Sequence, residues 1–505
     1  MTDKIIDLHT HVFNSAYVPL GEIINKSWGI NRPTAFILEK LVNAIARTSD
    51  LDYSRAFKLA SHGRKSLVHD DLNSQYDFYS EVLDDLCSQV LNHPNASEQS
   101  LVLTQTLEEI EFIYGDETEV EDIHKGIGNL FSKTRNLLKK FLMKAFSKVE
   151  QGIDKLDFVF KMLCSETYLV DQLRGYYKSQ YTENYLLIHL MMDMQYPFNA
   201  KKMKLDFDSE QIPRMKRLAM LSEGSLIGFS AFCPLRAYKK RLSAEEIISR
   251  VETSLAAGMC GFKFYPPMGY RPCENDAPLE LEAITDVFFD YCESHAIPIF
   301  THCTPAGFEV EKGKSGANAH PKYWQARLDK NPNLILCFGH AGGGRRIAEG
   351  EEVQGWLASG GLDSDEWTHQ NNYARCVANL CREYESVYCE FGYLHEVMNS
   401  EDDKNRFVTR LSMELMREGG SYSLSDKIMY GSDWHMPDMI NDLDDYIDVM
   451  QQIFTESGSG LSDVKNRFFY ENALKYLNLE SYLSRAKYSM GESYCESVAK
   501  RVGLS

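Results

Sequence analysis

The sequence lacks long apolar runs and clusters of basic residues. No stretch reaches the roughly eighteen consecutive apolar residues that a membrane-spanning helix requires. The 505 residues carry a formal net charge of −19, and the basic residues gather only into runs of two or three, such as Arg345-Arg346. Such a chain does not attract polyanions, so we expect neither nucleic acid nor an anionic membrane as its partner. The N-terminus has no basic region followed by an apolar stretch, so we expect a soluble protein without a leader.

The cysteines lack the paired loop spacing of a disulfide framework. There are twelve of them, scattered along the chain. Several fall within apolar runs: Cys233, Cys260, Cys303, Cys337 and Cys389. Buried, reduced thiols are typical of a reducing compartment, and we expect a cytoplasmic protein.

Short apolar runs alternate with helical patterns from about residue 185 onward. Together with the opening run, eight segments are predicted as strands: 4–12, 185–193, 226–233, 260–265, 297–303, 334–340, 386–391 and 427–433. Helical patterns lie between them, for example 243–257, which begins with a capping box of Ser243 and Glu246, and 278–294. Strand and helix repeated eight times predict an α/β fold, the (β/α)8 TIM barrel. An open doubly wound sheet has fewer strands and usually a glycine-rich first turn, which this chain lacks.

The segment between the first two predicted strands is much longer than an ordinary connection of a barrel. Its apolar residues recur at helical spacing over 72–91, 100–114 and 130–164. We therefore predict a barrel made of residues 1–13 and 181–480, a helical insertion over 14–180, and a helical tail over 481–505. Loops that leave the C-terminal ends of the strands surround the mouth of such a barrel, so the insertion is expected over the mouth as a lid. It could instead provide a surface for oligomerisation or for a protein partner.

Polar residues that could bind a metal or take part in catalysis lie at the same end of most of the predicted strands. They are His9, His11, Lys263, His302, His340 and Asp433. Side chains two residues apart on a strand point the same way, so His9 and His11 can reach one ion. Because barrel enzymes place their active groups at this end of the strands, the six residues together predict a metal site.

The residue types fit a divalent cation such as zinc, which binds imidazole and carboxylate groups. His9, His11, His302 and Asp433 suffice as ligands and leave a position for water, whose pKa falls to about 7 on binding. Asp433 could also accept a proton from that water, and His340 could polarise the scissile group or transfer protons. Beside a metal, Lys263 must be neutral, carbamylated by carbon dioxide, or slightly removed and paired with an anionic substrate group.

With these motifs the chain resembles the amidohydrolase superfamily of metal-dependent β/α-barrel enzymes. The matching pieces are Asp7-Leu8-His9-Thr10-His11, Thr301-His302, Gly339-His340-Ala341-Gly342-Gly343, Gly431-Ser432-Asp433-Trp434 and the closing helix 470–477. The glycine-rich and Gly-Ser-Asp-Trp pieces look most like the branch of aminocarboxymuconate-semialdehyde decarboxylase and related hydrolases. That resemblance implies one metal, held at His9, His11, His302 and Asp433, with proton transfer at His340.

The fourth strand adds a second resemblance. Lys263-Phe264-Tyr265-Pro266 looks like the carbamylated-lysine strand of dihydroorotase-type members, in which the lysine bridges two metals. This likeness implies that His302 and His340 ligate a second ion. We favour one essential ion, zinc for preference, with an optional second.

The substrate is a small molecule whose identity the motifs leave open. Residues expected to face it are Arg236, Tyr265, Trp434 and His435, with Arg345-Arg346 suited to a carboxylate or phosphate. Two other histidines receive structural roles, His189 in the core and His320 at the surface.

We expect a hydrolase in which metal-activated water attacks an amide, lactone or related carbonyl. A metal-dependent non-oxidative decarboxylase is the alternative, since the two reactions share nearly all ligands. A third possibility is a scaffold of minor catalytic activity whose helical insertion binds a partner.

Overall fold

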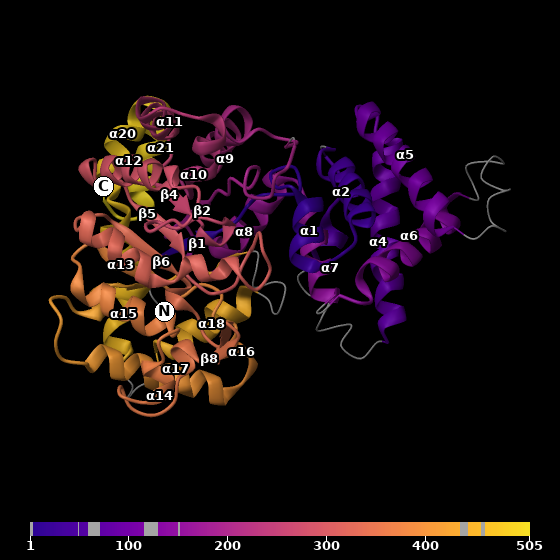
Figure 1. Ribbon diagram of the computed structural model, residues 1–505. Helices are drawn as coiled ribbons and strands as arrows, with labels where there is room; N and C mark the ends of the chain where they lie inside the picture. Colours follow the sequence, from indigo (N-terminus) through magenta and orange to yellow (C-terminus); the bar gives the residue numbers. More distant parts are fainter. Residues whose placement is uncertain are drawn as a thin grey trace.

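Eight parallel strands form the central sheet in a computed structural model of the chain (Figure 1). The structure describes residues 4–48, 50–58, 71–115, 130–149, 152–201, 203–434, 443–455 and 460–504. The strands follow one another around the sheet in chain order: β1 (Ile5–Thr10), β2 (Tyr185–Leu190), β3 (Leu226–Ala231), β4 (Phe262–Phe264), β5 (Ile299–His302), β6 (Leu336–Gly339), β9 (Val387–Glu390) and β10 (Ile428–Met429). Each lies within one of the eight predicted segments, and the predicted α/β barrel is confirmed.

The barrel closes between its first and last strands. Leu8 N donates a hydrogen bond to Tyr430 O at 3.3 Å, and His11 N donates to Trp434 O at 2.5 Å. A parallel bridge between Thr10 and Trp434 continues this seam past the end of β10. The first and last strands of the sheet therefore meet along one line of the barrel.

All residues of the eight strands are buried. Such uniform burial is typical of a parallel sheet, because side chains fill the barrel on one face and helices cover the other. The predicted capping box is present at α11, where Ser243 Oγ accepts from Glu246 N and Ser243 N donates to Glu246 Oε2. The helices of this part are α9 (Ile212–Leu221), α10 (Pro234–Lys240), α11 (Ala244–Ala256), α12 (Glu280–Ser294), α13 (Pro321–Lys330), α14 (Asp365–Thr368), α15 (Tyr373–Glu383), α16 (Glu396–Asn399), α17 (Glu401–Met416), α18 (Leu443–Ile453), α19 (Asn472–Leu477), α20 (Leu479–Met490) and α21 (Glu492–Arg501).

The chain between β1 and β2 is helical wherever the structure describes it as regular. Its helices are α1 (Leu20–Trp28), α2 (Arg32–Ala46), α4 (Leu72–Asn92), α5 (Ser97–Tyr114), α6 (Leu130–Phe146), α7 (Gly152–Met162) and α8 (Glu166–Tyr181). The pattern over 130–164 forms two helices, since α6 ends at Phe146 and α7 begins at Gly152, where a glycine favours a break. Figure 1 shows most of this segment in indigo to purple beside the barrel, with α8 against the barrel near β2 and α5 and α6 farthest from it. The proposed domain boundaries stay a prediction.

A small antiparallel hairpin, absent from our predictions, follows β6. Its strands are β7 (Arg346–Ala348) and β8 (Glu351–Val353). It belongs to the loops at the C-terminal end of the barrel, beside the residues described below. Among the helices that the structure describes, none is long and apolar enough to cross a membrane.

Candidate active site

The barrel brings five of the predicted residues to the C-terminal ends of its strands. His9 and His11 lie at the end of β1, where the pairing with β2 shifts register between Asp7 and Thr10. His302 is the last residue of β5, His340 directly follows β6, and Asp433 follows β10. A register irregularity re-aims side chains, and such features are common next to active sites.

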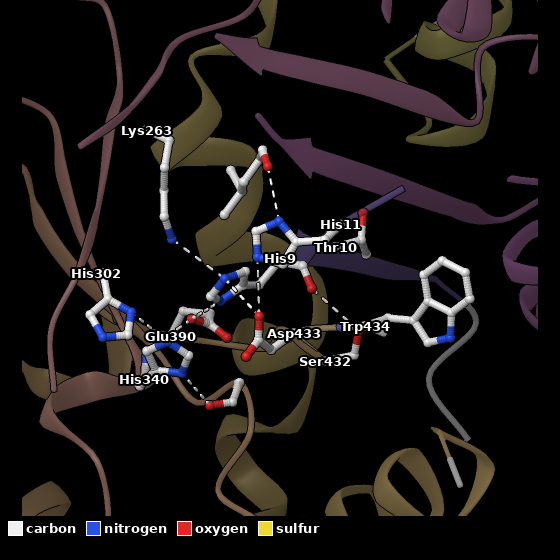
Figure 2. A network of polar contacts seen from close by, with 12 residues as sticks. His9, Thr10, His11, Lys263, His302, His340, Glu390, Ser432, Asp433 and Trp434 are labelled. Carbon is white, nitrogen blue, oxygen red and sulfur yellow. Dashed lines mark hydrogen bonds and ion pairs between the residues drawn. The ribbon is translucent and has the colours of Figure 1, made fainter. Parts of the chain in front are cut away.

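Three of these side chains converge on one point (Figure 2). His9 Nε2 lies 3.0 Å from Asp433 Oδ1, and His11 Nε2 lies 3.2 Å from the same oxygen. All three residues are buried, and their ligand atoms lie within 4.8 Å of one another. This is the spacing of a set of metal ligands.

In each imidazole, the outer nitrogen, which points away from the facing partner in the cluster, forms a hydrogen bond. These bonds indicate which ring nitrogen carries the proton. His11 Nδ1 donates to Leu190 O at 2.9 Å, because a carbonyl oxygen can only accept. His9 Nδ1 lies 3.2 Å from Glu390 Oε2, which also accepts from His340 N. Burial lowers the pKa of His11 to about 3, with the charge of Lys263 adding to the effect. When both rings are neutral and Nδ1 carries the proton, His9 Nε2 and His11 Nε2 each direct a lone pair toward Asp433 Oδ1.

Two imidazole lone pairs that face one carboxylate oxygen at 3.0 and 3.2 Å repel it unless a proton or a cation lies between them. The donor set of two imidazoles and one carboxylate matches the ligands of a divalent ion. The partners on the outer nitrogens are those that usually orient metal-binding histidines. The residues present therefore fit a metal ion.

Ser432, the residue before Asp433, is held by a second buried carboxylate. Ser432 donates to Asp7 from both its backbone nitrogen, at 2.9 Å, and its hydroxyl, at 2.6 Å. Tyr177 of α8 donates to Asp7 Oδ2 at 2.6 Å, the oxygen that also accepts from the Ser432 hydroxyl. Asp433 itself has a φ of 59°, in the left-handed region that residues other than glycine rarely adopt. Such strain persists only where the surroundings impose it, and Asp7 is the anchor here.

His302 and His340 form a second facing pair. His302 Nδ1 lies 3.1 Å from His340 Nε2. The outer nitrogens donate to carbonyl oxygens, His302 Nε2 to Ala306 O at 2.7 Å and His340 Nδ1 to Gly392 O at 2.8 Å. The inner nitrogens are therefore both acceptors when the rings are neutral, and burial lowers the pKa of both, that of His340 to about 4. A proton or a cation between them would satisfy both lone pairs.

Lys263 reaches the first cluster from β4. Its Nζ lies 3.4 Å from His9 Nε2 and 4.3 Å from the centre of the Phe300 ring. Burial lowers the pKa of Lys263 to about 8, and the charges of Asp433 and Glu390 oppose the shift. An amine with this pKa exchanges its proton readily near neutral pH.

A cavity of about 400 Å³ opens onto these residues. His9, His11, His302, His340 and Asp433 line its floor. Its walls come from the loops of the barrel and from the helical segment between β1 and β2: Ser27, Trp28, Lys155, Phe158, Tyr265, Thr304, Phe308, Glu309, Lys312, Arg346 and Tyr393 are among the lining residues. Positively charged side chains outnumber carboxylates in these walls, although the chain as a whole is strongly acidic.

Two of the four predicted substrate contacts do not line this cavity. Arg236 is fully buried and holds Asp193 with two hydrogen bonds, Nε to Oδ2 at 2.5 Å and Nη2 to Oδ1 at 2.7 Å. Its guanidinium is thus committed to an internal ion pair. Trp434 lies at the barrel seam under Lys161 Nζ, 5.7 Å from the ring centre, and its ring points away from the cluster in Figure 2.

Of the other two, Tyr265 lines the cavity and stacks on His302, with ring centres 4.4 Å apart. His435 lies outside the described residues. The expectation for His189 is confirmed, because it is buried on β2 and its Nδ1 meets Val12 N and Thr10 O.

The prediction that His320 lies at the surface is wrong. It is 6% exposed, its Nδ1 accepts from Lys322 N at the start of α13, and its Nε2 donates to Gln370 O. The ring is instead a buried cap at the N-terminus of α13.

Glu390 and Asp7 are the residues that our predictions missed. Glu390 is the last residue of β9, so it occupies the same position in its strand as His302 does in β5. Glu390 also stands near the C-terminal end of the strand predicted over 386–391. The criterion that selected the candidate ligands, a polar residue at that end of a strand, therefore applies to it as well. Asp7 carries no such signal, because its partners come from distant parts of the chain.

In a comparison with known proteins, part of the chain matches a protein-family model. The amidohydrolase family model matches residues 239–479, a span that contains Lys263, His302, His340 and Asp433. No curated protein matches the sequence.

Two solved structures resemble the chain weakly. One is a protein from Lactobacillus casei to which metal-dependent hydrolase activity is assigned, with 10% identity, coverage of 95% of this chain and 96% of that one, and a TM-score of 0.37. The other is the apo form of IDCase from Metarhizium anisopliae, with 14% identity, coverage of 62% and 79%, and a TM-score of 0.34. At these scores neither carries an argument. The match over residues 239–479 spans the barrel from β4 to β10, and over this part the chain is similar to the amidohydrolase family.

Proposed function

We propose that the protein is a metal-dependent hydrolase that attacks an amide, lactone or related carbonyl of a small molecule. The observation that carries the proposal is the convergence of His9 Nε2 and His11 Nε2 on Asp433 Oδ1 in a buried cluster. The facing lone pairs need a cation, and the adjoining cavity has room for a small organic substrate.

His9, His11 and Asp433 would hold the ion, zinc for preference, with His302 as a further ligand. When bound, such an ion supplies Lewis acidity and lowers the pKa of water. Every outer nitrogen of these histidines is already committed to a partner, so the ligands are oriented in advance.

Asp433 is suited to accept the proton of the attacking water. Burial raises the pKa of its carboxyl to about 6, against the opposing charges of His340 and Lys263, so its basicity suits neutral pH. His340 can exchange a proton at Nε2, because its Nδ1 proton is fixed on Gly392 O. We assign the leaving group's proton to this nitrogen.

Lys263 and the His302–His340 pair are where an optional second ion would be held. A neutral Lys263 can react with carbon dioxide to give a carbamate, which has the charge that a second cation requires. The pKa of about 8 leaves a usable neutral fraction near neutral pH. We retain one essential ion as the primary assignment.

A test of the reaction compares hydrolysis with decarboxylation. The full chain, stripped and reloaded with zinc or manganese, is incubated with esters, lactones and amides in 18O-labelled water. We expect metal-dependent release of an acid that carries one labelled oxygen. Release of carbon dioxide from a panel of unsaturated and aromatic acids, without hydrolysis, would favour the decarboxylase.

Matched histidine variants complete this test. His9→Asn should lose both bound metal and turnover, whereas His295→Asn, which changes an exposed histidine at the end of α12, should keep both. A metal-loaded protein that is inactive on all panels and co-purifies with a partner through residues 14–180 would favour the scaffold function.

A further inference from the structure

The outer wall of the cavity is built by helices that precede β2. Trp28 is the last residue of α1, and Lys155 and Phe158 belong to α7. Lys155 and Phe158 are three residues apart, so they lie on the same face of their helix, and both line the cavity. The segment between β1 and β2 thus contributes directly to the space in which a substrate lies.

Aromatic rings continue from this wall to the catalytic floor. Trp28 and Phe158 have ring centres 5.9 Å apart, and Phe158 lies 6.3 Å from Phe308 of the loop after β5. Phe308 lies 6.5 Å from Tyr265, whose ring stacks on His302. An unbroken series of rings therefore joins α1 and α7 to a candidate metal ligand.

Hydrogen bonds fix the loop that carries Phe308. Phe308 N donates to Tyr265 Oη at 3.0 Å, and Ser27 Oγ donates to Glu309 O at 3.4 Å. Gly307 has a φ of 132°, and a Cβ at this position would lie 2.4 Å from Tyr265 Oη and 2.9 Å from His302 Nε2. Only glycine allows this close approach, so the aromatic wall has a defined position relative to His302.

We propose that Trp28, Phe158 and Phe308 form the specificity pocket of the enzyme, which receives a planar apolar group of the substrate beside the carbonyl under attack. The proposal rests on the proposed hydrolase function for the reaction, but it makes a separate statement about binding. Offset and edge-to-face ring contacts favour an aromatic or unsaturated group over a saturated one of the same size. Two of the three residues, Trp28 and Phe158, lie outside the part of the chain that matches the family.

The neighbouring Phe160 provides a matched control. It belongs to the same helix, is buried to the same degree, and packs on Tyr79 with ring centres 5.0 Å apart. Phe158→Leu and Phe160→Leu therefore remove the same ring from the same helix, but only Phe158 lines the cavity. Circular dichroism and thermal melting establish that each variant is folded, and Trp28→Leu, at a half-buried position, tests the pocket independently.

Binding is measured by calorimetry on the metal-loaded full chain with 2-naphthoate and acetate, two carboxylates that differ in their apolar part. We expect Phe158→Leu and Trp28→Leu each to weaken 2-naphthoate binding about three- to tenfold and to leave acetate binding unchanged, because one ring contact is lost. Phe160→Leu should change neither. Equal losses in the Phe158 and Phe160 variants, or failure of 2-naphthoate to bind more tightly than acetate to the unaltered chain, would overturn the proposal.

A kinetic comparison separates this proposal from the proposed reaction. If 2-naphthyl acetate and ethyl acetate are hydrolysed, the two pocket variants should lower kcat/KM for the naphthyl ester alone. Selective binding without any hydrolysis would contradict the hydrolase and leave the pocket standing. Hydrolysis with unchanged selectivity in both variants would refute the pocket and leave the hydrolase standing.

Discussion

The inner nitrogens of the four cluster histidines all carry lone pairs because the outer nitrogens are occupied. The partners are two kinds of group, the carboxylate of Glu390 for His9 and backbone carbonyls for the others. A carbonyl partner depends on the local backbone, which no side-chain substitution removes. Glu390 is therefore the partner that mutation can test.

Replacing Glu390 by alanine should loosen the metal site without touching a ligand. His9 would lose the acceptor at 3.2 Å, and His340 N would lose its partner at 3.1 Å. Loss of such an orienting group typically lowers metal affinity about 10- to 100-fold. Titration against a competing chelator measures the effect. Glu390→Gln, whose carbonyl oxygen accepts the same two hydrogen bonds, should keep most of the affinity, and equal affinities in the alanine variant and the unaltered chain would contradict this role.

His320 should make stability depend on pH. Burial lowers its pKa from 6.5 to about 4, so between these values the unfolded chain binds more protons than the folded one. The free energy of unfolding then decreases as pH falls from about 7 toward 4, by up to roughly 3 kcal/mol. Urea unfolding at pH 7 and pH 5 measures the loss.

His320→Asn supplies the comparison, because asparagine caps helices well and does not titrate. The variant should lose less stability than the unaltered chain between the two pH values. Parallel losses in both proteins would show that other groups carry the pH dependence.

Single residues were predictable where position in a strand decides function. That His9, His302, His340 and Asp433 lie at the same end of the barrel was predictable, because each stands near the C-terminal end of a predicted strand, and Glu390 has the same position. Arg236 was misassigned because sequence does not reveal that Asp193 is in bidentate reach. A buried ion pair depends on the three-dimensional fold, which position along the chain does not describe.

Among the structural elements, the hairpin β7–β8 places a positively charged side chain in the cavity wall. Arg346 begins β7, lines the cavity, and donates from Nη1 to Glu396 Oε1 at 2.5 Å. Glu396 thus holds the guanidinium in one orientation. The hairpin provides a fixed positive group in the lining of the cavity.

Arg346→Ala should discriminate between charged and neutral substrates. For a substrate that carries a carboxylate away from the scissile bond we expect KM to rise about tenfold or more, since hydrogen bonds to charged groups contribute about 1.5–3 kcal/mol. A neutral ester of the same size should be unaffected. Steady-state kinetics on the two substrates, with the exposed Arg32→Ala as control, measures the difference. A similar rise for both substrates would indicate a structural role.

Elements were predictable in proportion to the strength of their pattern. The barrel strands are buried on both faces and read as continuous apolar runs, so all eight were found. The strands of the hairpin have three residues each and are largely exposed, which leaves no periodic signal. The turn between α6 and α7 was missed because apolar spacing continues across it.

For the whole molecule, metal content distinguishes the one-ion and two-ion assignments. We expect elemental analysis of protein grown with zinc or manganese to give one ion per chain, retained in Lys263→Ala. Close to two ions per chain, with loss of the second in that variant, would contradict the single essential ion. The measurement needs no substrate.

Removal of the ion should destabilise the folded chain. A ligand that binds only the native state adds about 2.7 kcal/mol when it is present at 100 times its Kd. The Tm should therefore fall on chelation and recover on addition of zinc, and Asp433→Ala should melt at the same temperature with and without the ion. A Tm that does not respond to chelation would count against a site in the cluster.

The carboxylate of Asp7 has a consequence for the biogenesis of the enzyme. It binds Ser432, which lies 425 residues further along the chain, and Tyr177, which closes the helical segment after β1. A ribosome must thus have made residues 9–433 before His9 and His11 meet the carboxylate that completes their cluster. A chain that ends before Asp433 cannot assemble this cluster, so ion loading at the cluster follows the synthesis of the last barrel strand.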